Sequence, residues 1–165
     1  MKKKLLQQQV NLLMSERLIK GFDAKKYAAW GVELLQNVCE SDNICILAGV
    51  DYDERETVDK YFYLVAHELD LKTDYCEEEL FFHYSINLAK KVVDGIVDPV
   101  SGVHLMYDIY LRSEYNSRYS GFMDLDDAIL SIECNEYPYT WPELTNGNKE
   151  EIILKEFKAF LETAK

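Results

Sequence analysis

Residues 74–95 read DYCEEELFFHYSINLAKKVVDG and carry the clearest helical pattern of the chain. The apolar residues of this stretch recur every three or four positions, which places them on one face of a helix. Asp74 and Glu77 have the spacing of a capping box, and Gly95 stands where glycine commonly ends a helix. The stretch therefore predicts a long amphipathic helix with a buried face of Leu80, Phe81, Tyr84, Leu88 and Val92.

The chain before this stretch repeats the pattern in shorter pieces. Apolar residues spaced seven apart predict a first helix over residues 5–19, ended by Gly21. Asp23 stands in the N-cap position of a second helix over residues 27–38. Two helices with so short a joint form an αα-hairpin.

Residues 44–50 are apolar on all sides, and no comparable alternating run exists with which a strand could pair. We therefore expect a short buried helix there. Asp51 or Asp53 then caps a helix over residues 58–69, with an acidic residue at the capping-box position.

The C-terminal third has the same pattern with weaker boundaries. Pro99 suits a helix start, so residues 103–110 are expected to be helical, followed by a loop over residues 113–121. Asp124 is expected to cap a helix over residues 128–132.

The sequence changes in character between residues 133 and 146, where Pro138 and Pro142 remove backbone hydrogen-bond donors. This stretch predicts an aromatic surface loop, after which Asn148 and Glu151 open the last helix. No domain linker interrupts residues 1–165. The sequence thus predicts an all-α, single-domain protein, either an irregular helical bundle or a short HEAT-like stack of antiparallel helix pairs.

Charge is distributed unevenly along the chain. Residues 1–26 hold seven Lys or Arg against Glu16 and Asp23, whereas the remainder holds 11 against 28 Asp or Glu. Such an acidic body repels nucleic acid and anionic membranes and attracts basic partners. We therefore expect a basic protein partner, no direct nucleic-acid binding and no membrane binding. The alternative explanation is that the acidic charge serves only to keep the protein in solution.

Three features bear on compartment. No apolar run reaches the roughly 18 residues of a membrane span, and the basic start has no apolar signal region after it. The four cysteines, at irregular spacing, have the pattern of buried reduced thiols; a redox pair of Cys39 and Cys45 is the alternative. We expect a cytoplasmic protein.

Chemical motifs are sparse, and we expect no cofactor and no enzymatic activity. Glu79 and His83, four residues apart on one helix, are the best alternative, because they could bind one divalent metal ion. The same spacing also suits a solvated hydrogen-bonded pair. Asp124, Asp126 and Asp127 lack the pattern of a calcium-binding loop.

Tyrosine is the unusual residue, with 12 in the chain. Several lie in the C-terminal third among acidic residues, and Tyr and Trp are favoured at the centres of protein interfaces. The alternative is that they cover the edge of the core. The predicted partner-binding residues are Tyr107, Tyr110, Tyr115, Tyr119, Asp124, Asp126, Asp127, Glu136, Tyr137, Tyr139, Trp141 and Glu143.

The runs WGVELL at residues 30–35, ICILAG at 44–49 and VDKYF at 58–62 together resemble a segment of small acidic helical immunity proteins of bacterial toxin-immunity systems. The resemblance spans about a fifth of the chain and carries no functional residue over. It implies a class of function, the neutralisation of a cognate toxin by tight binding.

Together these features favour an immunity- or antitoxin-like inhibitor that occludes the active site of a toxin, such as a basic nuclease. A helical scaffold or adaptor protein is the second hypothesis, and a metal-dependent enzyme using Glu79 and His83 is the third. Homodimerisation through exposed aromatic residues stays open.

Overall fold

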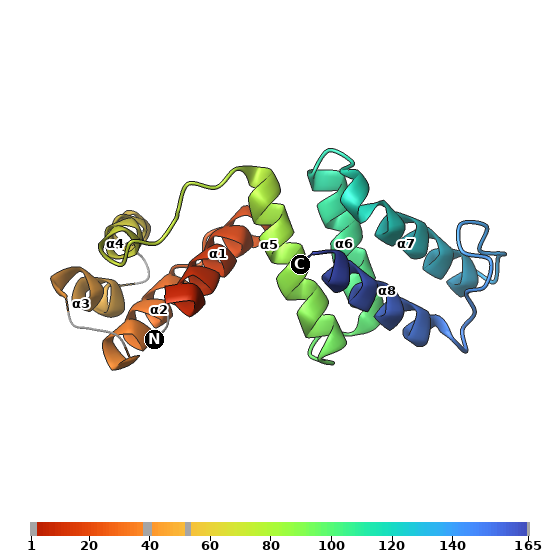
Figure 1. Cartoon of the computed structure of the whole chain (residues 1–165), viewed down its shortest axis with the longest axis horizontal. Coiled ribbons are helices and arrows are strands. Elements are labelled where there is room, and N and C mark those ends of the chain that lie inside the picture. Colours follow the sequence, from red (N-terminus) through yellow and green to blue (C-terminus); the bar gives the residue numbers. More distant parts are fainter. Residues whose placement is uncertain (1–2, 38–40, 52–53, 165) are drawn as a thin grey trace. The chain divides into compact units, whose positions relative to one another are not determined.

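Every regular element is a helix in the part of the chain that the structure, a computed structural model, describes: residues 3–37, 41–51 and 54–164 (Figure 1). The predicted all-α class is confirmed. The elements are α1 (Lys3–Lys20), α2 (Ala24–Asn37), α3 (Asp42–Gly49), α4 (Arg55–Glu68), α5 (Glu77–Val93), α6 (Pro99–Arg112), the 3-10 helix η1 (Ser117–Tyr119), α7 (Ser120–Glu133) and α8 (Lys149–Thr163).

Contacts divide the chain into two compact units, Met1–His83 and Tyr84–Lys165, so that the boundary falls within α5. The expectation of a single domain over residues 1–165 stays a prediction.

The first unit closes around aromatic rings from α2 and α4. The Phe62 ring lies 4.8 Å from that of Tyr27 and 5.5 Å from that of Trp30, both in edge-on contact. Of the predicted apolar stripe of α1, Leu6, Val10 and Leu13 join this core, together with Met14. The residues spaced seven apart are not its buried members: Leu5 is exposed, and Leu12 and Ile19 are half-buried. Edge-on ring pairs contribute beyond the area they bury, which favours one packing arrangement over others.

Helices α2 and α3 approach each other at Gly31. A Cβ atom at this position would stand 2.9 Å from the backbone nitrogen of Ala48. Backbone cannot move aside as the end of a side chain can, so only glycine fits.

The second unit packs α6 against α7 and α8. The rings of Phe122 on α7 and Phe157 on α8 lie 4.8 Å apart, and Phe122 also contacts the ring of Phe160 at 5.7 Å. Four residues of the last helix are predicted to point inward; Ile153, Phe157 and Phe160 are buried, and Leu161 is half-buried.

Several predicted helix ends are confirmed. Gly21 and Gly95 follow α1 and α5 with positive φ angles of 89° and 71°. Pro99 begins α6, and the Asp98 carboxylate accepts a hydrogen bond from the Ser101 amide at 2.8 Å. Glycine ends and capped starts are local signals, which is why the sequence predicts them.

Three predicted starts are wrong. α5 begins at Glu77. The Glu79 carboxylate caps this start by accepting a hydrogen bond from the Cys76 amide at 3.0 Å. The predicted cap was the pair of Asp74 and Glu77. Glu54 is the N-cap of α4 instead of Asp51, without a side-chain cap. The predicted cap Asp53 lies outside the described residues, as does Val38 at the end of the second predicted helix.

The third correction concerns α7. This helix starts at Ser120, so the predicted loop to Gly121 is too long and Asp124 is inside the helix, not its cap. The reason is a preceding 3-10 turn, whose cap is Asn116: its side chain accepts from the Arg118 amide at 3.0 Å. A turn of this kind brings the chain into a helix without a cap at the first α-helical residue.

Cysteine exposure is a further correction. Cys45, Cys76 and Cys134 are free and exposed, although buried thiols were predicted. Cys45 lies on α3, whose buried residues are Ile44 and Leu47, so this short helix is amphipathic and not buried on all sides. Cys39 lies outside the described residues.

Among the described residues, no helix combines the length and apolar character needed to cross a bilayer.

We predict that Gly31→Ala lowers the free energy of unfolding by about 1–3 kcal/mol, because the added methyl group overpacks the α2–α3 contact. Gly49→Ala is the matched control in the same unit, since a Cβ there meets no atom within 4 Å. The control should raise stability by up to about 1 kcal/mol. Equal effects of the two substitutions in urea denaturation would contradict the close approach.

Candidate functional site

Three of the predicted tyrosines form one ring cluster at the end of α6. The rings of Tyr107 and Tyr110 stack with their centroids 6.4 Å apart, and Tyr115 contacts Tyr110 edge-on at 5.5 Å. Tyr107 and Tyr110 are half-buried, whereas Tyr115 is 66% exposed. The cluster therefore presents aromatic surface to solvent at the C-terminal end of α6.

Tyr115 has an unusual backbone conformation. Glu114 and Tyr115 have φ angles of 54° and 65°, in the left-handed region. For residues other than glycine this region costs roughly 1–2 kcal/mol, and it is rare for bulky side chains. Strained residues of this kind concentrate at functional sites. Glu114 and Tyr115 also close the end of α6, where the Tyr115 amide donates to the Tyr110 carbonyl at 2.9 Å. It is the 66% exposure of Tyr115 that shows how little its ring contributes to the core.

The prediction that Tyr119 binds a partner is wrong. Tyr119 is only 1% exposed, and its ring lies 6.2 Å from that of Phe160. As the last residue of η1, it points into the core of the second unit just before α7 begins. A partner cannot reach it, so it does not belong to an interaction surface.

The three aspartates of α7 differ in their surroundings. Asp126 is largely buried and pairs with His104 of α6, and the Asp124 carbonyl oxygen accepts a hydrogen bond from the Thr140 hydroxyl at 2.8 Å. Asp127 is exposed, and its carboxylate lies 3.3 Å from the same hydroxyl. Asp127 is therefore the aspartate that a partner can contact most readily.

The aromatic loop after α7 holds a second ring pair, and it is exposed as predicted. Tyr137 and Tyr139 are 56% and 82% exposed, with ring centroids 4.9 Å apart. Trp141 is half-buried, while Glu136 and Glu143 are exposed.

This loop is held in place although it has no regular structure. Thr140 ties it to α7, Leu144 is buried, and the Asn148 side chain accepts from the Thr145 amide at 2.7 Å and donates to the Glu143 carbonyl at 2.9 Å. A loop whose backbone is already ordered loses little entropy when it binds a partner. Thr140 helps to hold this loop against α7, a role that the sequence pattern did not indicate.

Charge in the second unit is concentrated in the same segment. Residues 84–165 hold 14 Asp or Glu and eight Lys or Arg. Eight of these acids, but only Arg112 and Arg118 of the basic residues, lie between residues 107 and 143, so six of each sign remain outside. Arg112 pairs with Asp108 at 2.8 Å. The net negative charge of the unit thus comes from residues 107–143, which we call the acidic tyrosine segment.

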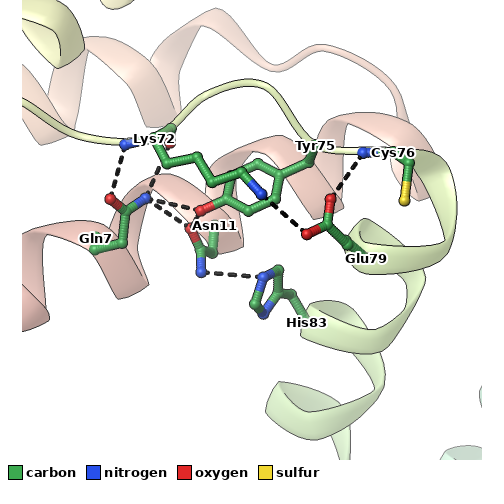
Figure 2. Close-up of polar contacts among 7 residues, drawn as sticks. All are labelled: Gln7, Asn11, Lys72, Tyr75, Cys76, Glu79 and His83. Carbon is green, nitrogen blue, oxygen red and sulfur yellow. Dashed lines mark hydrogen bonds and ion pairs between the residues drawn. The ribbon is translucent and has the colours of Figure 1, made fainter.

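Glu79 and His83, the alternative metal ligands, belong to a polar network in the first unit (Figure 2). The Glu79 carboxylate accepts from Lys72 Nζ at 2.9 Å as well as from the Cys76 amide, and the hydrogen bond from Lys72 lowers the pKa of Glu79. His83 Nε2 lies 3.2 Å from Asn11 Nδ2. Within the described parts of the chain, no three His, Cys, Asp or Glu residues are grouped to hold a metal ion.

No protein-family model, curated protein or solved structure matches this chain. The resemblance to immunity proteins therefore stays a prediction.

We predict that Glu114→Gly raises the free energy of unfolding by roughly 0.5–1 kcal/mol, because glycine adopts positive φ without strain but loses more entropy on folding. Tyr115→Gly should stay near wild type, since relief of the same strain is offset by the lost ring contact with Tyr110. Thermal and urea unfolding measure both. A loss of more than about 2 kcal/mol in Tyr115→Gly would identify Tyr115 as a structural residue instead.

Proposed function

We propose that this protein binds a basic protein partner through the acidic tyrosine segment. The observation that carries the proposal is that the net charge of the second unit arises in the segment that also holds the exposed rings of Tyr115, Tyr137 and Tyr139. Rigid aromatic side chains with charged residues around them are typical of interface centres and their rims.

Charge and aromatic rings have different roles in such an interface. Uncompensated carboxylates such as Asp127, Glu136 and Glu143 attract a positive surface over a distance and raise the association rate. Tyr137 and Tyr139 bury area after docking and lower the dissociation rate. Arginine is a suitable partner residue, because guanidinium groups both stack on aromatic rings and pair with carboxylates.

We further propose that the partner is a toxin and that binding is inhibitory and stoichiometric, as in immunity proteins. Support comes from the resemblance over residues 30–62 and from the acidic charge of the chain. An acidic surface is complementary to the basic cleft of a nuclease. A scaffold protein, by contrast, would leave the activity of its partner unchanged, and an activity assay with the bound partner separates the two.

Charge reversal tests the steering role. We expect Asp127→Lys combined with Glu143→Lys to lower the association rate of a partner captured from the native lysate by on the order of tenfold at low salt. Glu162→Lys on α8 is the control, because this exposed acid lies in the same unit but outside the segment. Surface plasmon resonance at low and high ionic strength measures the rates.

Tyr139→Ala should leave the association rate unchanged and raise the dissociation rate, because the ring acts after docking. Glu162→Lys changes the charge by half as much as the paired reversal. If it changed the activation free energy of association by half as much, the total charge and not the segment would govern association. If capture were unaffected by all of these substitutions, the partner would bind elsewhere.

A further inference from the structure

The connection between α4 and α5 is fastened to α1 by side chains (Figure 2). Gln7 on α1 holds the backbone of Lys72 at both of its polar groups: its Oε1 accepts from the Lys72 amide at 2.8 Å and its Nε2 donates to the Lys72 carbonyl at 2.9 Å. Leu71 beside it is buried in the core of the first unit. Residues 69–76, which we call the α1-docked segment, are thus tied to α1 by Gln7 and by Lys3, which pairs with Asp70, and to the core by Leu71.

Each hydrogen bond in this network has a direction that the Lys72 backbone sets. An amide N–H can only donate, so the Gln7 oxygen must face it and the Gln7 NH₂ group must face Asn11. Besides the Lys72 carbonyl, Gln7 Nε2 lies 2.9 Å from both Asn11 Oδ1 and the Tyr75 hydroxyl oxygen, and that hydroxyl donates to Asn11 Oδ1 at 2.6 Å. The Asn11 NH₂ group therefore points at His83.

The orientation of the Asn11 amide group determines the protonation state of His83. The Asn11 NH₂ group only donates, so His83 Nε2, at 3.2 Å, must accept and carry no proton. The imidazole is then neutral, with its proton on Nδ1. Protonation would set an N–H group against the Asn11 NH₂ group. Asn11 cannot turn over in response, because its NH₂ group would then meet that of Gln7.

The other groups around His83 favour the same neutral form on balance. Burial is the main cause that lowers the pKa of His83 below 6.5; the charge of Lys72 lowers it too, and that of Glu79 raises it. The Tyr75 ring lies edge-on to the imidazole at 5.3 Å. These groups come from the α1-docked segment and α5, while α1 contributes the neutral Asn11.

We propose that His83 and Asn11 form a proton-sensitive latch that holds the α1-docked segment in place when His83 is neutral and releases it when His83 is protonated. All of its residues lie in the first unit, so the proposal is independent of the proposed function. The pKa of His83 in the folded protein lies below its value in the unfolded chain. The latch is therefore closed above pH 6.5 and opens as the pH falls through the folded pKa of His83.

Hydrogen exchange of the Lys72 amide tests the latch on the full chain, because this N–H is the one that Gln7 holds. After correction for the intrinsic exchange rate, its protection should fall roughly three- to tenfold between about pH 7.5 and 5, the size of one ordinary hydrogen bond. In NMR spectra, His83 should be protonated at Nδ1 alone above its pKa and should titrate below 6.5.

Two variants should remove the fall in Lys72 protection at low pH, each for a different reason. His83→Gln can accept from Asn11 without titrating, so the pH dependence of Lys72 protection should disappear. Asn11→Asp replaces the donor by a carboxylate that pairs with protonated His83, so the pKa of His83 should rise above 6.5 and protection should persist at pH 5.

Three outcomes would overturn the latch. They are protection of the wild-type Lys72 amide that does not depend on pH, an unchanged pH dependence in His83→Gln, and titration of wild-type His83 at or above 6.5. The wild-type titration remains decisive even where a variant fails to fold.

Discussion

Burial of aromatic and aliphatic stripes is the constraint on which every helix of this protein depends. The α-helices run from 8 to 18 residues, a length at which an isolated helix is marginal in water. Each unit therefore packs its helices around buried aromatic rings. These are Tyr27, Trp30 and Phe62 in the first unit and Phe122 and Phe157 in the second. An aromatic ring left outside a core is therefore an exception to the way in which the chain is stabilised.

The most exposed rings, Tyr115, Tyr137 and Tyr139, lie where the acidic charge is concentrated, whereas Tyr63 on α4 is a lesser exception at 40% exposure. Tyr115 keeps a strained backbone at the end of α6, and Tyr139 stands in a loop that Thr140 ties to α7. Neither ring is needed to close the core, which already holds Tyr119. This coincidence of exposed ring, fixed backbone and uncompensated carboxylates is the physical basis for proposing an interaction surface.

Much of the fold could be predicted from local patterns, because helix stripes and glycine ends depend on residues a few positions apart. The stripe of α5 and the end at Gly95 are examples. The start of α7 was missed, because the cap lies in a separate 3-10 turn at Asn116. Tyr119 was misplaced for a related reason: its pattern resembles that of its exposed neighbours, and only packing against Phe160 separates them.

The polar network of the first unit lay beyond sequence reasoning altogether. Gln7 and Lys72 are 65 positions apart, and Asn11 and His83 are 72 apart. Amide side chains have no periodic signal that announces such partners. Glu79 and His83 were singled out by spacing, yet the structure gives each a different partner, Lys72 and Asn11. Spacing identified the residues but not their role.

The central claim is that a basic partner binds the acidic tyrosine segment. Hydrogen–deuterium exchange of the full chain, with and without the captured partner, tests it most directly. The account predicts that backbone protection appears within residues 107–143, above all at the end of α6 and in the loop around Tyr139. Protection confined to residues 1–83 would contradict it.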